Sequence, residues 1–142
     1  MSHPLVILII DDSKGYTLYL KKLIKHTNVH GRPIQIISID NIEQALPQIS
    51  EGQFDIIFAD DVFPKSKMSG HRLLQHIKCR QDEHRVLISG RKLIKKVSLD
   101  DVLLNDVMLI KTISKRDLNS VYMGKLISVV SQKKMIQVSK TH

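Results

Sequence analysis

Five short apolar runs alternate along this chain with segments whose apolar residues have helical spacing. Each run has the length of a β-strand, and the predicted strands are residues 5–10, 34–39, 54–59, 85–88 and 107–110. Short strands that alternate with helices form an open parallel sheet with helices on both faces, because crossover connections are right-handed. We therefore predict an α/β fold with a five-stranded, doubly wound parallel sheet.

The two ends of the chain set the predicted domain boundaries. Residues 5–10 are aliphatic throughout, which is typical of a strand buried on both faces of a sheet. Ser114 is predicted to cap the last helix, which should run to about residue 130. Residues 132–142 are polar and basic, and we expect a disordered tail there. The folded domain should span residues 1–131.

Composition narrows the location and the class of partner. The 142 residues suit a single domain, and the only cysteine, Cys79, cannot form an internal disulfide, which fits a reducing compartment. The N-terminal apolar run is too short for a membrane span and ends in acidic residues, unlike a signal peptide. We expect a cytoplasmic protein without membrane insertion. The net charge of +8 favours either an acidic partner or a solvated lysine-rich surface.

Polar residues gather where the predicted strands end, because the carboxyl ends of parallel strands meet at one edge of a sheet. These residues are Asp11, Asp12, Asp60, Ser89 and Lys111. Converging carboxylates repel one another unless a cation joins them, and hard oxygen ligands of this kind suit Mg²⁺. A hydroxyl and an ammonium add hydrogen bonds and positive charge for a phosphoryl group. The pattern predicts a Mg²⁺-assisted phosphoryl-transfer site.

Taken in this order, the motifs resemble the CheY-like receiver domain of two-component response regulators, from residue 6 to about residue 130. The matching pieces are Ile-Leu-Ile-Ile-Asp11-Asp12, Phe-Asp-Ile-Ile-Phe-Ala-Asp60-x-x-x-Pro64, Gly70, Val-Leu-Ile-Ser89-Gly90 and Leu-Ile-Lys111. The resemblance implies a flavodoxin-like sheet with strand order 2-1-3-4-5 and a single-domain regulator. It also implies no enzymatic activity beyond self-phosphorylation and autodephosphorylation.

The resemblance assigns a role to each site residue. Asp60 would be the phosphoacceptor, Ser89 would contact the phosphoryl group, and Lys111 would pair with it. The implied Mg²⁺ ligands are Asp11, Asp12, Asp60 and the backbone carbonyl of Val62. Asp61 would be a bystander, because neighbouring strand residues point to opposite faces of a sheet.

Two departures from the family pattern affect the passing on of a signal. The family usually has a proline with a cis peptide bond after the lysine, whereas Thr112 follows Lys111, and we expect a trans bond because a non-proline cis bond costs about 3–4 kcal/mol. The family usually has an aromatic switch residue three positions before the lysine, where this chain has Met108. An alternative is therefore a degenerate receiver that is not phosphorylated and acts as a protein-interaction module.

The resemblance implies a histidine kinase or phosphotransfer protein as phosphodonor and a downstream protein as target. The family's usual output face combines the fourth helix, fifth strand and fifth helix. Its basic residues here are Arg91, Lys92, Lys95, Lys96, Lys115 and Arg116. These could bind an acidic protein, or form homodimer contacts with Asp100, Asp101 and Asp106. We do not expect nucleic acid as a partner, because the sequence has neither an aromatic-lined basic stripe nor a groove-entering helix.

Overall fold

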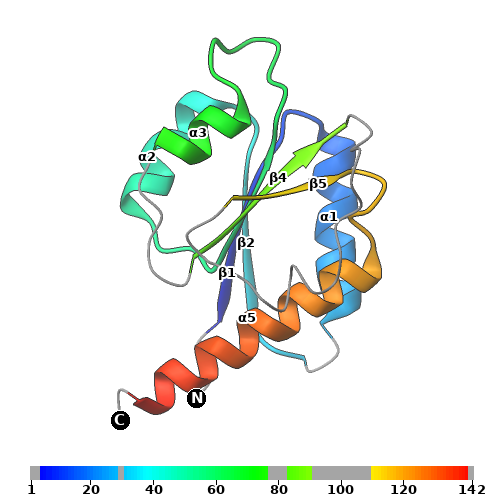
Figure 1. Cartoon of the computed structure of the whole chain (residues 1–142), viewed down its shortest axis with the longest axis vertical. Coiled ribbons are helices and arrows are strands. Elements are labelled where there is room, and N and C mark those ends of the chain that lie inside the picture. Colours follow the sequence, from blue (N-terminus) through cyan, green and yellow to red (C-terminus); the bar gives the residue numbers. More distant parts are fainter. Residues whose placement is uncertain (1–3, 29–30, 77–82, 91–109, 141–142) are drawn as a thin grey trace.

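The structure is a computed structural model that describes residues 4–28, 31–76, 83–90 and 110–140. Its elements are β1 (Leu5–Ile10), α1 (Lys14–Thr27), β2 (Ile34–Ile39), α2 (Ile42–Glu51), β3 (Ile56–Asp60), α3 (Gly70–His76), β4 (His84–Ser89), β5 (Ile110–Ser114) and α5 (Ser120–Lys140). The sheet lies between two layers of helices, with α2 and α3 on one face and α1 and α5 on the other (Figure 1).

All the strand pairs are parallel, and their order is β2-β1-β3-β4-β5. The predicted fold class and strand order are therefore confirmed. This order places β1 and β3 side by side in the middle of the sheet, with Ile10 of β1 opposite Ala59 of β3. The residues that follow these two positions meet at the same edge, and they are the aspartates singled out in the sequence.

Alternate residues of the central strands supply two separate cores. Ile7 and Ile9 of β1 pack in the cluster that includes Leu20 of α1 and residues of α5. Leu8 and Ile10 pack in the other cluster, with residues of α2 and α3. The period of two along a strand explains why β1 is apolar throughout, since both of its faces are covered by helices.

The predicted end of the fifth strand is wrong. The sequence interpretation ended it at residue 110, whereas β5 begins at Ile110 and ends at Ser114. Pairing with β4 sets this register, because Ile88 lies opposite Ile113 and Ser89 lies opposite Ser114. Residues 107–109, which include Met108, lie outside the described residues. Cys79, most of the predicted basic output edge and the acidic residues Asp100, Asp101 and Asp106 lie outside them as well.

The last helix also differs from the prediction at both ends. Ser114 does not cap it; the side-chain oxygen of Asn119 accepts hydrogen bonds from the backbone N–H groups of Val121 and Tyr122 instead. The helix continues to Lys140, past the residue at which the sequence predicted its end, and the domain boundary expected after residue 131 stays a prediction. The Lys134 ammonium holds this part of the helix by donating to the Pro4 carbonyl at 2.7 Å and to the Asp55 carboxylate at 2.9 Å.

Among the described residues, none of the helices combines the length and the apolar character that crossing a membrane would require.

Candidate functional site

Asp11 and Asp12 follow directly after β1 and form the first part of the site. Asp11 is almost fully buried, and its backbone N–H donates to the Ile39 carbonyl at 3.1 Å. Its Oδ1 accepts from the backbone N–H of Ser13 at 2.8 Å, while the Ser13 hydroxyl accepts from Tyr16 and caps α1. Asp12 is exposed. The turn between β1 and α1 thus directs one carboxylate inward and leaves the next one in solvent.

Asp60 is the last residue of β3 and is buried, with 7% of its surface exposed. Its Oδ1 accepts from the backbone N–H of Asp61 at 2.9 Å. The side chain of Asp61 accepts from the backbone N–H of His71 at 3.4 Å, in the first turn of α3. Asp61 therefore contacts α3, and it does not belong to the group of carboxylates formed by Asp11, Asp12 and Asp60.

Gly70 lets α3 begin close to the end of β3. A Cβ atom at this position would lie 1.8 Å from the Asp60 carbonyl oxygen, and the backbone N–H of Gly70 donates to the Asp61 carbonyl at 2.9 Å. No side chain fits into that gap without moving the backbone that carries Asp60. The glycine matched in the sequence thus has a steric role, because it lets α3 approach the end of β3.

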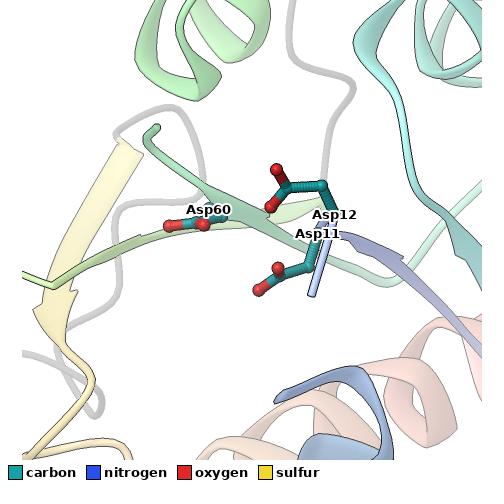
Figure 2. A group of neighbouring side chains, drawn as sticks. All are labelled: Asp11, Asp12 and Asp60. Atoms are coloured by element: carbon teal, nitrogen blue, oxygen red, sulfur yellow. The ribbon is translucent and has the colours of Figure 1, made fainter. Parts of the chain in front are cut away.

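The three aspartates meet at one point of the sheet edge (Figure 2). One carboxylate oxygen from each of Asp11, Asp12 and Asp60 can be chosen so that all lie within 4.8 Å of one another. Burial raises the pKa of Asp11 to about 6; the hydrogen bond from Ser13 opposes this rise and the charge of Asp60 adds to it. Burial also raises the pKa of Asp60, and the charge of Lys115 lowers it. Burial therefore disfavours the ionised form of the carboxylates that meet at this site.

These residues fit a divalent cation with hard oxygen ligands. Asp11 Oδ2 is buried and has no hydrogen-bond partner among the described residues, which is costly for a carboxylate oxygen unless a cation meets it. Mg²⁺ is bound by one or two carboxylates together with waters and backbone carbonyls, which matches this donor set. Val62 is placed beside the site, and its backbone N–H donates to the Asp60 carboxylate. The role predicted for its carbonyl stays a prediction.

The other two predicted site residues, Ser89 and Lys111, do not lie at the same level of the sheet. Ser89 is the last residue of β4 and is buried, at the same edge as Asp60. Lys111 is the second residue of β5 and lies opposite Val86. Ser114, at the strand end, lies three positions further on, which is about 10 Å along an extended strand. The expectation that Lys111 ends the strand is wrong, because β5 pairs with β4 four residues later than predicted.

Lys115 stands where the sequence interpretation had placed Lys111. It follows β5 directly, and its backbone N–H donates to the Ser89 carbonyl at 2.9 Å. Its charge lowers the pKa of both Asp11 and Asp60. A signal was present in the sequence, since Ile113-Ser114 repeats the Ile88-Ser89 ending of β4 and the structure pairs the two endings.

With Lys115 in this place, the two departures from the family pattern move to other residues. Arg116 follows the lysine and Thr112 lies three positions before it, so neither a proline nor an aromatic residue is present at these positions either. The peptide bonds among the described residues contain no cis bond, which confirms the trans bond expected after Lys111.

Comparison with known proteins identifies the fold through solved structures and finds no match by sequence. No protein-family model matches the sequence, and no curated protein matches it. Solved structures do match. The response regulator receiver domain protein from Clostridium thermocellum is 18% identical, with a TM-score of 0.63 over 93% of this chain and 98% of its own. The CheY-like receiver domain protein from Methanospirillum hungatei is 20% identical, with a TM-score of 0.63 over 95% and 99%.

A third match is the signal receiver domain of an HD domain-containing protein from Pseudomonas fluorescens. It is 16% identical, with a TM-score of 0.67 over 98% of this chain and 95% of its own. The likeness spans nearly the whole length in all three cases, so it concerns the complete sheet and its helices. Together with the strand order and the carboxylates at the sheet edge, these matches show that this chain has the fold of response-regulator receiver domains.

Proposed function

We propose that this protein is a response regulator of a two-component phosphorelay that accepts a phosphoryl group on Asp60 with Mg²⁺. The observation that supports this most strongly is the meeting of Asp11, Asp12 and Asp60 at one edge of a receiver-type sheet. The charge of Lys115 acts on two of these carboxylates. A nucleophilic carboxylate, a cation site and a lysine are the groups that phosphoryl transfer to an aspartate requires.

The proposed step is an in-line displacement at phosphorus. A carboxylate oxygen of Asp60 forms a bond to the phosphorus of a phosphohistidine or an acyl phosphate, and the bond from phosphorus to the donor breaks. The donor leaves with that electron pair, and Asp60 becomes an acyl phosphate. Mg²⁺, which Asp11, Asp12 and Asp60 would hold, supplies positive charge opposite the phosphoryl oxygens when it is bound.

The role first given to Lys111 passes to Lys115. Its position after β5 and its effect on the Asp60 carboxylate support an ion pair with the phosphoryl group. Ser89 lies at the same edge and would donate its hydroxyl to a phosphoryl oxygen. The partners we propose are a histidine kinase or phosphotransfer protein as donor and a downstream protein as target, in the cytoplasm. We propose no enzymatic activity beyond self-phosphorylation and autodephosphorylation.

A second candidate is a degenerate receiver that acts through protein contacts alone. The observation in its favour is the absence of both a proline after Lys115 and an aromatic residue at Thr112, which are the parts of the family pattern that pass a signal to the surface. The acceptor carboxylates are all present. The two candidates therefore differ in whether Asp60 becomes phosphorylated.

Intact mass measurement separates the two candidates. The protein is incubated with Mg²⁺ and acetyl phosphate, and we expect the parent to gain the mass of one phosphoryl group. Asp60→Asn should gain none, whereas Asp61→Asn, which alters the neighbouring carboxylate, should still gain it. No adduct on the parent at saturating Mg²⁺ would favour the degenerate receiver.

A matched pair of lysine variants tests the corrected position. Lys115→Ala should slow adduct formation, because it removes positive charge beside Asp60. Lys111→Ala should leave the rate near that of the parent, because Lys111 lies inside β5 opposite Val86. The reverse order of the two rates would return the role to Lys111.

A further inference from the structure

Tyr16, in the first turns of α1, contacts the site through its ring. The ammonium of Lys115 lies 4.7 Å from the centre of the Tyr16 ring, within the range of a cation–π interaction. The ring also packs against the core cluster between the sheet and α5. Tyr16 thus joins the helix that follows Asp11 and Asp12 to the lysine that follows β5.

The hydroxyl of Tyr16 lies in surroundings that, in the part of the chain that the structure describes, neither pair it nor favour its ionised form. Its oxygen is buried and has no hydrogen-bond partner among the described residues. Burial raises the pKa of this hydroxyl, and the nearby Tyr19 and the charges of Asp11 and Asp60 raise it further. The side chain therefore stays neutral beside the carboxylates, and its ring keeps the electron-rich face that attracts an ammonium.

A neighbouring tyrosine holds the segment that carries Lys115. The Tyr19 ring packs on Tyr16 with 5.6 Å between ring centres and 38° between ring planes. Its hydroxyl donates to the Leu118 carbonyl at 3.1 Å, in the connection between β5 and α5. The two rings together link α1 to Lys115 and to Leu118, which lies three residues further along the chain.

We propose that Tyr16 is a positioning residue of the acceptor site, which holds the Lys115 ammonium in place before a phosphodonor arrives. A lysine side chain has four rotatable carbon–carbon bonds and is strongly hydrated, so a fixed position for its charge requires a partner. The Tyr16 ring is that partner in this structure. The inference rests on the proposed function, because the charge matters only if Asp60 accepts a phosphoryl group.

The contact itself can be measured without phosphorylation. The ε-methylene protons of Lys115 should show an upfield ring-current shift in NMR spectra of the unphosphorylated protein. The shift should persist in Tyr16→Phe, which keeps the ring, and disappear in Tyr16→Leu, which removes it. An ordinary Lys115 shift in the parent protein would overturn the proposed contact.

A double-mutant cycle tests whether Tyr16 acts through Lys115. We expect Tyr16→Leu to lower the second-order rate constant with acetyl phosphate about 3- to 10-fold, the size expected of a partly exposed cation–π contact. In the Lys115→Ala background the same substitution should have no effect, and Tyr16→Phe should restore the parent rate. Thermal unfolding of each variant shows whether the compared proteins are folded.

The outcomes separate this inference from the proposed function. An equal loss of rate with and without Lys115 would mean that Tyr16 only supports packing, and the positioning role would be overturned. A ring-current shift in a parent that forms no adduct would overturn the proposed function instead, and with it the role of Tyr16 in that reaction.

Discussion

The two edges of the sheet differ in whether their charged side chains form ion pairs. At the amino-terminal edge, Glu83 and Arg85 form an ion pair at 2.7 Å, with 1% and 2% of their side chains exposed. Arg85 also donates to the Leu74 carbonyl, and Asp55 pairs with Lys134. At the carboxyl-terminal edge, three aspartates meet, and neither of the two ion pairs among the described residues involves them.

This difference teaches where the fold accepts a loss of stability. A buried charge without a partner destabilises a protein, and the amino-terminal edge shows that this chain can pair such charges. The carboxyl-terminal edge instead brings Asp11 and Asp60 together in an environment that raises the pKa of both. The buried Arg85 and Glu83 form an ion pair, whereas the buried Asp11 and Asp60 form none among the described residues, which is the arrangement expected of a site that binds a cation.

Breaking the buried pair at the amino-terminal edge should have the largest effect. Arg85→Ala removes the guanidinium from a carboxylate that is 1% exposed, and we expect the free energy of unfolding to fall by about 3–5 kcal/mol. Urea unfolding at pH 7 measures it. Arg72→Ala is the control, since Arg72 is exposed on α3 and should change stability by less than about 0.5 kcal/mol. A loss below about 1 kcal/mol for Arg85→Ala would show that the pair is not structural.

Overpacking the carboxyl-terminal edge should have the next largest effect. Gly70→Ala places a methyl group against the Asp60 carbonyl, so we expect a loss of about 2–3 kcal/mol and slower adduct formation. Gly15→Ala is the matched control, because its Cβ meets no atom within 4 Å. Unfolding and phosphorylation rates are measured on both variants. If Gly70→Ala changed neither the free energy of unfolding nor the phosphorylation rate, the close approach of residue 70 to the Asp60 carbonyl would not be needed.

The unpaired carboxylates should make stability depend on pH. The folded pKa of Asp11, about 6, lies above the ordinary value of 3.8, so the folded state binds the proton more tightly than the unfolded state. Stability is therefore greatest below the ordinary value and falls as the pH rises through about 6. After allowance for solvent screening, we expect a loss of about 1–2 kcal/mol in Mg²⁺-free buffer.

Two measurements sharpen this expectation. Asp11→Asn should flatten the pH dependence of the unfolding free energy, because it removes the titrating group. Saturating Mg²⁺ should reverse the trend in the parent, since the cation binds the ionised carboxylates and stabilises the folded state. A parent whose stability rises through this pH range without Mg²⁺ would contradict the picture of an uncompensated site.

The partly exposed ion pair at the amino-terminal edge should have the smallest effect. Lys134 and Asp55 have about one fifth of their side chains exposed, so Lys134→Met should cost about 0.5–1 kcal/mol, and less at high salt. Hydrogen exchange should become faster in the last turns of α5. Lys133→Met is the control, and an equal effect of both substitutions would mean that the ion pair does not anchor the helix.

The sequence was sufficient for the first two strands of the chain and for the acidic half of the site. Residues 5–10 and 34–39 coincide with β1 and β2, because unbroken or β-branched apolar runs between turn residues leave little choice of boundary. Asp11 and Asp12 come directly after β1, and Asp60 is the last residue of β3, one position after the predicted end of that strand. Parallel strands with right-handed crossovers bring their carboxyl ends to one edge, whatever the details of the loops.

The basic half of the site depended on pairing between strands. Residues 107–114 read Val-Met-Leu-Ile-Lys-Thr-Ile-Ser, which allows a strand to end at residue 110 or at residue 114. Local pattern cannot choose between these ends, because register is set by hydrogen bonds to a neighbouring strand. Pairing of Ser114 with Ser89 makes the choice, and it puts Lys115 at the edge in place of Lys111.

Local sequence thus specified the alternation of strands and helices along the chain and the three carboxylates, since apolar periodicity and strand ends are properties of short segments. Long-range contacts decided the rest. The Lys134–Asp55 pair joins residues 79 positions apart and holds α5 past its expected end, and the Lys115 ammonium lies over the ring of Tyr16, which belongs to α1. Such contacts form only when distant segments are packed together, so the places of Lys115 and Tyr16 become known only from the folded chain.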